Sequence, residues 1–238
     1  MKKKVMGLFC SIVLSTPLWA AELTVATAAG YRKPLTEVFN AFTESTGIQI
    51  DSAFGNIKQI EAQARQNPNI QILIGDWFFI EPMKLAQEHV VIGQGKLVLV
   101  SPKDNPLSSL NDLLNDSAKK IAIADRKNAI YGKAAMECFT EQGLLKDIEP
   151  KLLEVTTLPQ VSTYVVTNEV DAGFVNLSEA QAHQDKLGPP IEMPQSCYRA
   201  IDLSAAPITG RSNTREANAF LQFLTTENAR VILMRHGL

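Results

Sequence analysis

The sequence has few of the side chains that usually hold metal ions or carry out catalysis. Histidine and cysteine occur only three times each in 238 residues. His89, His183 and His236 have no partner at the spacing of a metal site. The patterns G-x-S-x-G, H-E-x-x-H, G-x-x-x-x-G-K-[ST] and G-x-G-x-x-G, which mark common hydrolase, metalloprotease and nucleotide sites, are also absent. The sequence therefore predicts no resident metal or cofactor, and no enzyme.

Long apolar runs and excess positive charge are lacking as well. Apart from residues 5–18, no stretch approaches the roughly 20 apolar residues that span a bilayer. That run follows three lysines and ends before Ala20 and Ala21, which predicts a cleaved signal peptide over residues 1–20. Without those three lysines, 20 of the 23 basic residues remain against 25 acidic ones. This balance argues against nucleic acid as a partner.

Two of the three cysteines are expected in the exported chain. Cys10 lies in the predicted signal peptide and leaves with it. Cys138 and Cys197 could form a disulfide in an oxidising compartment, or each could be a buried small hydrophobe. The sequence leaves both alternatives open.

The segment from Leu23 to Phe42 is the clearest local signal. LTVATAA at residues 23–29 is typical of a short buried strand, Gly30 of a turn, and Pro34 of the first turn of a helix. The helix that follows has an apolar face formed by Leu35, Val38, Phe39 and Phe42. A helix that begins at the end of a strand presents unpaired N–H groups there, which can bind an anion without a charged side chain.

Strand and helix patterns then alternate along the whole chain. Strands are expected over residues 48–53, 70–74, 96–100, 120–124, 152–155, 171–175 and 199–203. Helices are expected over residues 57–64, 82–87, 109–114, 131–142, 161–166, 217–224 and 226–235, and a polar helix is expected after Ser178. Such alternation predicts parallel sheets covered by helices.

A turn-rich break at residues 101–106 separates two series of this kind. We therefore predict an α/β protein of two lobes, each a mostly parallel sheet flanked by helices, with a ligand cleft between them. The first lobe comprises residues 22–98 and 204–238, and the second residues 99–203. The crossings near Leu99 and Leu203 would serve as the hinge.

Five segments resemble the periplasmic molybdate- and tungstate-binding proteins of ABC transporters, which have the type-II solute-binding fold. They are LTVATAA at 23–29, FxxFxxxTG at 39–47, LVLVSPK at 97–103, AIAD at 122–125 and DAGFVNLSEA at 171–180. The resemblance covers essentially the whole chain after the signal peptide. It implies a periplasmic protein that captures an oxyanion by hinge closure and delivers it to an inner-membrane permease. A monomer is expected.

The resemblance also implies where the ligand binds, although the residues differ there. The family holds its anion with two serine hydroxyls, backbone N–H groups and a tyrosine. The corresponding positions carry no such serine, and the second serine aligns with Asn56 or Ile57. The ligand-binding residues implied are Gly30, Tyr31, Asn56, Ile57, Tyr131, Val161 and Asn176.

Two accounts of these differences remain open. In the first, an oxyanion is still bound by rearranged N–H, amide and phenol donors. In the second, Arg32 or Arg126 at the rim of the cleft favours a carboxylate or phosphate-bearing ligand. Gly30 is equally compatible with a permissive turn alone, and Asn56 with a helix N-cap alone.

The biological role has two alternatives. The first is the substrate-binding component of an importer. The second is a secreted sensor of the same fold that reports its ligand to a membrane receptor.

Overall fold

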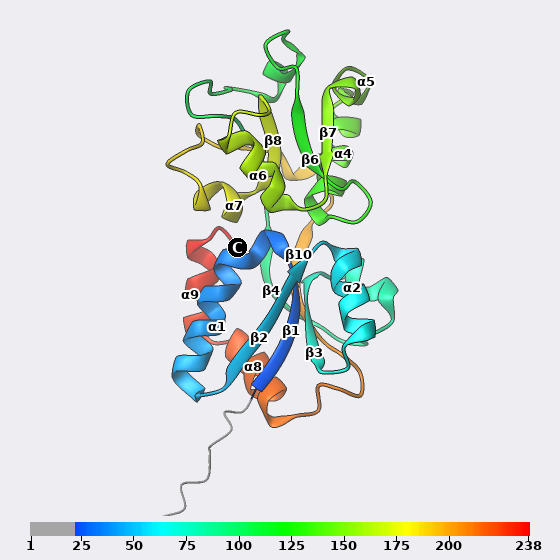
Figure 1. Cartoon of the computed structure of the whole chain (residues 1–238), viewed down its shortest axis with the longest axis vertical. Coiled ribbons are helices and arrows are strands. Elements are labelled where there is room, and N and C mark those ends of the chain that lie inside the picture. Colours follow the sequence, from blue (N-terminus) through cyan, green and yellow to red (C-terminus); the bar gives the residue numbers. More distant parts are fainter. Residues whose placement is uncertain (1–21) are drawn as a thin grey trace, which may run out of the picture.

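The chain forms two lobes that lie one above the other in Figure 1, each built on a five-stranded sheet. The structure is a computed structural model and describes residues 22–238. The predicted signal peptide, residues 1–20, lies outside the described residues. The expected two-lobed α/β architecture is confirmed.

The strands are β1 (Glu22–Ala28), β2 (Gln49–Gly55), β3 (Ile70–Asp76), β4 (Val90–Gly95), β5 (Leu97–Val100), β6 (Ile121–Ala124), β7 (Leu152–Val155), β8 (Ala172–Asn176), β9 (Ile191–Glu192) and β10 (Ile201–Pro207). The α-helices are α1 (Arg32–Thr46), α2 (Ile57–Gln66), α3 (Trp77–Ile80), α4 (Ile130–Glu141), α5 (Leu145–Ile148), α6 (Leu158–Val166), α7 (Leu177–Ala182), α8 (Arg215–Leu224) and α9 (Glu227–Arg235). Short 3-10 helices are η1 (Ala29–Tyr31), η2 (Glu81–Met83), η3 (Leu110–Leu114), η4 (Glu149–Lys151) and η5 (Gln195–Cys197).

Both sheets are mixed rather than mostly parallel. The strand order of the first is β2-β1-β3-β10-β4, and that of the second is β7-β6-β8-β5-β9. In each sheet the first three strands in this order pair in parallel. The fourth strand pairs antiparallel with both the third and the fifth. The strands that follow the two crossings, β5 and β10, are the ones that pair antiparallel with both of their neighbours.

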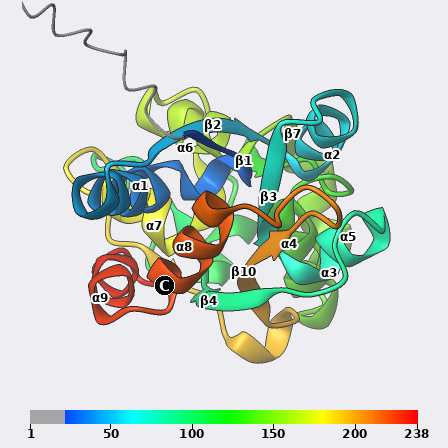
Figure 2. The same cartoon turned by 90° about the horizontal axis from the view of Figure 1, so that it is seen from below.

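The expected first helix forms because its apolar face can be buried completely or nearly so. Leu35, Val38 and Phe42 of α1 are fully buried. Phe42 packs edge-on against Phe220 of α8, with ring centroids 5.1 Å apart. Gly47, with a φ of 74°, ends the helix in the left-handed conformation that glycine adopts most easily. Figure 2 shows α1 and α2 on opposite sides of strands β1 to β3.

Strand pairing places the crossings slightly earlier in the chain than the predicted lobe boundaries. Leu97 and Val98 pair with β8 of the second sheet, whereas Ile201 and Leu203 pair with β4 of the first. The chain therefore changes sheet at Lys96 and again between β9 and β10. The last two helices return to the first lobe, where α8 and α9 contact α1.

Three predicted helices differ from the structure. Residues 82–87 do not form an α-helix: the helical segment begins earlier, at Trp77, and ends at Lys84, whose φ is 56°. Within the helix expected at 109–114, Leu110–Leu114 form the 3-10 helix η3 instead of an α-helix. The helix expected at 161–166 begins at Leu158, because Thr157 and Gln160 form a capping box.

Cys138 and Cys197 form a disulfide, which settles the alternative that the sequence left open. Both cysteines are buried. The bond fastens the segment that leads into β10 to helix α4 of the second lobe. Among residues 22–238, no helix is long and apolar enough to cross a membrane.

Candidate functional site

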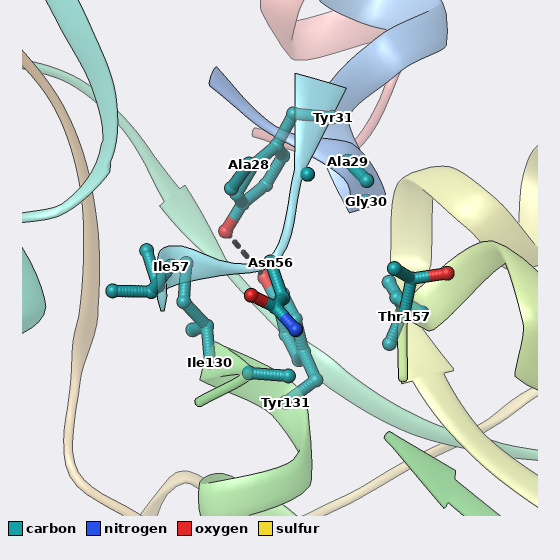
Figure 3. Close-up of a pocket in the computed structure, with 12 residues that line it drawn as sticks. Ala28, Ala29, Gly30, Tyr31, Asn56, Ile57, Ile130, Tyr131 and Thr157 are labelled. Carbon is teal, nitrogen blue, oxygen red and sulfur yellow. Dashed lines mark hydrogen bonds between the residues drawn. The ribbon is translucent and has the colours of Figure 1, made fainter. Parts of the chain in front are cut away.

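A small cavity lies between the lobes, where β1 and β2 of the first lobe meet the starts of α4 and α6 of the second (Figure 3). Its volume is about 20 Å³, measured for the centre of a water-sized sphere. One water molecule needs roughly 10–15 Å³ on this scale, so the closed cavity suits only a ligand of a few atoms. The cavity is lined by Ala28, Ala29, Gly30, Tyr31, Gly55, Asn56, Ile57, Ala129, Ile130, Tyr131, Thr157 and Leu158.

Helices from both lobes begin at this cavity. The 3-10 helix Ala29–Tyr31 leads directly into α1, and α2 begins at Ile57. From the second lobe, α4 begins at Ile130 and α6 at Leu158. The first N–H groups of a helix have no partner within the helix, and the helix dipole gives its start a partial positive charge. None of the lining residues has a charged side chain. The cavity is therefore suited to an anion held by neutral donors.

Tyr31 and Tyr131 meet across the two lobes. Their hydroxyls lie 2.8 Å apart and share a hydrogen bond, and their rings pack edge-on with centroids 6.1 Å apart. Burial raises the pKa of Tyr31 far above its usual value. Burial also raises the pKa of Tyr131, and the neighbouring Tyr31 adds to the shift. Both phenols therefore keep their hydrogens at neutral pH and can act as hydrogen-bond donors.

Gly30 forms part of the contact surface between the lobes. A Cβ atom at this position would lie 2.5 Å from Leu158 Cδ2 and 3.3 Å from Asn176 Nδ2. Asn176 Nδ2 also donates to the Gly30 carbonyl over 2.9 Å. The space that a serine side chain would need is thus taken by the second lobe. A side-chain hydroxyl at position 30 would require Leu158 to move in this closed arrangement.

Asn56 and Ile57 donate to the other lobe. Asn56 Oδ1 accepts from the Gln59 N–H as the N-cap of α2, while its Nδ2 donates to the Thr156 carbonyl over 3.3 Å. The Ile57 N–H donates to the Asn128 carbonyl over 2.9 Å. These two sequence-predicted donors line the cavity, but their hydrogen bonds join the lobes.

The structure brings together five of the seven predicted site residues as cavity lining: Gly30, Tyr31, Asn56, Ile57 and Tyr131. Asn176 lies beside them, caps α7 through its Oδ1 and contacts Gly30. Val161 does not line the cavity, because it lies one turn into α6. A Cβ at Gly173 of β8 would lie 2.7 Å from its side chain.

Sequence reasoning missed Thr157 and Leu158, which line the cavity at the start of α6. The signal was present in the sequence, because Thr157 and Gln160 have the spacing of a capping box and Pro159 suits a first helical turn. Ala129 and Ile130 also line the cavity. They are apolar, and nothing in their residue types indicated a site.

The two arginines considered as rim cations are occupied elsewhere. The Arg32 guanidinium lies 3.9 Å from the centre of the Phe54 ring. Arg126 forms ion pairs with Glu149 and Glu154, at 2.9 and 2.7 Å. Neither arginine lines the cavity. Across residues 22–238, no group of three or more His, Cys, Asp or Glu side chains is arranged to hold a metal ion.

A separate charged cluster lies beside the second crossing. Asp76, at the end of β3, is 2% exposed and forms an ion pair with Arg199. The Arg199 guanidinium also lies 4.0 Å from the centre of the Phe78 ring. The backbone N–H of Arg199 donates to the Glu137 carboxylate of α4 over 3.1 Å. Burial raises the pKa of Asp76, and the hydrogen bond from Arg199 opposes this shift. The cluster ties both lobes to the hinge.

Two α/β lobes, two crossings and a small neutral cavity between the sheets define a solute-binding protein. The chain belongs to the family of bacterial extracellular solute-binding proteins, which matches residues 23–238. It is a binding protein and not an enzyme.

Among known relatives, the chain is 30% identical to the molybdate-binding protein ModA of Rhodobacter capsulatus, over 94% of this chain and 90% of that protein. It is 23% identical to a Bacillus subtilis (strain 168) lipoprotein, YvgL, that carries the name of an ABC transporter substrate-binding protein, over 90% of this chain and 85% of that one. Among solved structures, the periplasmic molybdate-binding protein of Azotobacter vinelandii matches with a TM-score of 0.82 and 22% identity, over 90% of this chain and 97% of that one.

Proposed function

We propose that the protein binds a small tetrahedral oxyanion, molybdate or tungstate first of all, between its two lobes. The protein would act in the periplasm as the substrate-binding component of an ABC importer. In this role the ligand bridges donors from both lobes and favours the closed form. The closed form then docks transiently on an inner-membrane permease.

The observation that carries this proposal is a small cavity at which four helical segments begin without a charged side chain nearby. Helix starts bind anions through N–H groups and the helix dipole. A tetrahedral anion presents oxygens in several directions at once, which suits donors that converge from two lobes. The similarity to the molybdate-binding protein of Rhodobacter capsulatus supports the same ligand class.

The contacts of Arg32 and Arg126 weigh against the carboxylate or phosphate account. That account needed a free cation at the rim, whereas Arg126 is held by Glu149 and Glu154 and Arg32 covers Phe54. An anion that keeps a proton, such as hydrogen phosphate, also needs an acceptor, which N–H and hydroxyl donors supply poorly. A fully deprotonated oxyanion fits the donor set better.

The similarity to the Bacillus subtilis lipoprotein YvgL, which carries the name of an ABC transporter substrate-binding protein, favours a role in import over a role in sensing. The predicted signal peptide supports export. A sensor would share the cavity and differ in its docking surface. Neighbouring genes for a permease and an ATPase, rather than for a histidine kinase, would distinguish the two roles.

The test is calorimetric titration of desalted protein beginning at residue 22 with molybdate, tungstate, sulfate, phosphate and acetate. We expect binding of molybdate and tungstate, weaker binding of sulfate, and none of acetate. At 1,000 times Kd, a bound ligand stabilises the fold by about 4 kcal/mol, so a thermal shift provides an independent readout.

Arg126→Ala is the matched control, because it removes the cation that the carboxylate account invoked without touching the cavity. Its affinity for molybdate should equal that of the wild type. Binding of acetate but of no oxyanion, or loss of molybdate binding in R126A, would contradict the proposed ligand class.

A further inference from the structure

The two tyrosines are the most unusual part of the cavity lining. Among the lining residues, only Tyr31, Asn56, Tyr131 and Thr157 have polar side chains. The Asn56 amide caps α2 and bonds the other lobe. Thr157 is the N-cap of α6, where its backbone N–H donates to the Gln160 side chain over 3.0 Å, and Figure 3 shows the Thr157 hydroxyl oxygen pointing away from the tyrosine pair. The phenol pair is therefore the side-chain donor best placed for a ligand.

One of the two hydroxyl hydrogens in this pair is not used in the bond between the tyrosines. Two hydroxyls carry two hydrogens, and the bond of 2.8 Å between Tyr31 and Tyr131 uses one of them. Within residues 22–238, the Asn176 side chain also bonds to the Tyr131 hydroxyl, but it does so as a donor and takes up neither phenol hydrogen. Both rings are nearly or fully buried, with 0% and 2% exposure, so the remaining hydrogen does not point into bulk solvent. A buried donor of this kind strongly favours an acceptor.

The pair also sits on the hinge. A Cβ at Gly95 would lie 2.0 Å from the Tyr131 hydroxyl and 2.9 Å from the Tyr31 hydroxyl. Gly95 ends β4, immediately before the chain changes sheet at Lys96. The two phenols come from opposite lobes, so their hydrogen bond exists only when the lobes are closed. A ligand that contacts this pair therefore favours the closed form of the two lobes.

We propose that the Tyr31 and Tyr131 hydroxyls form one composite donor, which makes both ligand contact and lobe closure. One hydroxyl donates to the other, and the second donates its own hydrogen to an oxygen of the bound anion. This inference rests on the proposed function for its ligand, while its closing role concerns the ligand-free protein as well.

The experiment uses Tyr31→Phe, Tyr131→Phe, the double variant and Tyr198→Phe. Tyr198 is the matched control, because its buried hydroxyl accepts from the Leu97 N–H over 3.1 Å and does not line the cavity. Three quantities are measured: Kd for molybdate by calorimetry, the radius of gyration of ligand-free protein by X-ray scattering, and the near-ultraviolet tyrosine difference spectrum on adding molybdate.

We expect Y31F and Y131F each to weaken molybdate binding by about tenfold or more. The double variant should bind molybdate only slightly more weakly than the more impaired of the two single variants, because the two hydroxyls act as a unit. Both single variants should enlarge the mean radius of ligand-free protein and abolish the difference spectrum. Y198F should bind molybdate within about threefold of the wild type.

Wild-type affinity and radius in Y131F, or an equal loss in Y198F, would overturn the proposal. If the wild type binds no oxyanion, the proposed function fails and the donor role fails with it. The radius of ligand-free Y131F then decides the closing role separately: an increase supports it, and an unchanged value rejects it.

Discussion

Gly30→Ala should weaken ligand binding by hindering closure. The substitution adds one methyl group at the point where a Cβ would lie 2.5 Å from Leu158 Cδ2. The strain is steric, because Gly30 has no left-handed φ. Leu158 belongs to the second lobe, so the clash exists in the closed form and is relieved when the lobes separate.

The size of the effect follows from the cost of overpacking. Inserting a methyl into a well-packed contact costs about 1–3 kcal/mol, which corresponds to a roughly 5- to 150-fold increase in Kd when only the closed form bears it. The open form should keep its stability, so the ligand-free melting temperature should change little. Calorimetric titration with molybdate, or with whichever anion the wild type binds, measures the change.

A second substitution tests the cause. Leu158→Ala removes the atom that the new methyl would meet, so G30A should be less harmful in L158A than in the wild type. Gly75→Ala is the matched control, because a Cβ there would have only ordinary contacts, the nearest at 3.4 Å to Ile57 of the same lobe. Wild-type affinity in G30A, or strictly additive effects of G30A and L158A, would refute the steric explanation.

Three further changes test other parts of the fold. Replacing Cys138 and Cys197 by serine opens a cross-link that spans 59 residues, which should lower the free energy of unfolding in urea by about 4 kcal/mol. Arg199→Met leaves the buried Asp76 carboxylate without its cation and should cost about 3–5 kcal/mol at neutral pH. The folded-state pKa of Asp76 is already raised and would rise further, so the loss should shrink as the pH falls through that pKa; a penalty independent of pH would contradict this. Ser178→Ala removes a 2.7 Å hydrogen bond to a carbonyl just after α9 and should weaken ligand binding about fivefold, whereas an unchanged Kd would show that this contact does not aid closure.

The sequence was most informative where local patterns determine structure. The strand, turn and helix from Leu23 to Thr46 follow from apolar spacing and from Pro34, and the structure has all three. The direction of β5 and β10 was not available from such patterns. Each strand enters a sheet whose other members are distant in sequence, and its direction depends on where the chain crosses between lobes.

The site was predictable as a set of positions but not as a set of contacts. Alignment with the family placed Asn56 and Asn176 near the ligand, and amide groups are adequate donors. Their hydrogen-bond partners are backbone carbonyls of the opposite lobe, at sequence separations of 100 and 146 residues. The Tyr31–Tyr131 bond also spans 100 residues. Local sequence patterns hold no information on such pairs.

These contacts bear on how the protein closes and releases its ligand. Asn56, Ile57 and Asn176 each donate to the opposite lobe, so part of the closing free energy comes from the protein itself. A larger closed fraction without ligand raises the apparent affinity, because less of the binding free energy goes into moving the lobes. The same bonds oppose release, since they must break before the cavity opens. A permease that separates the lobes would therefore act on this set of hydrogen bonds, which makes the interlobe contacts as important for delivery as the donors are for capture.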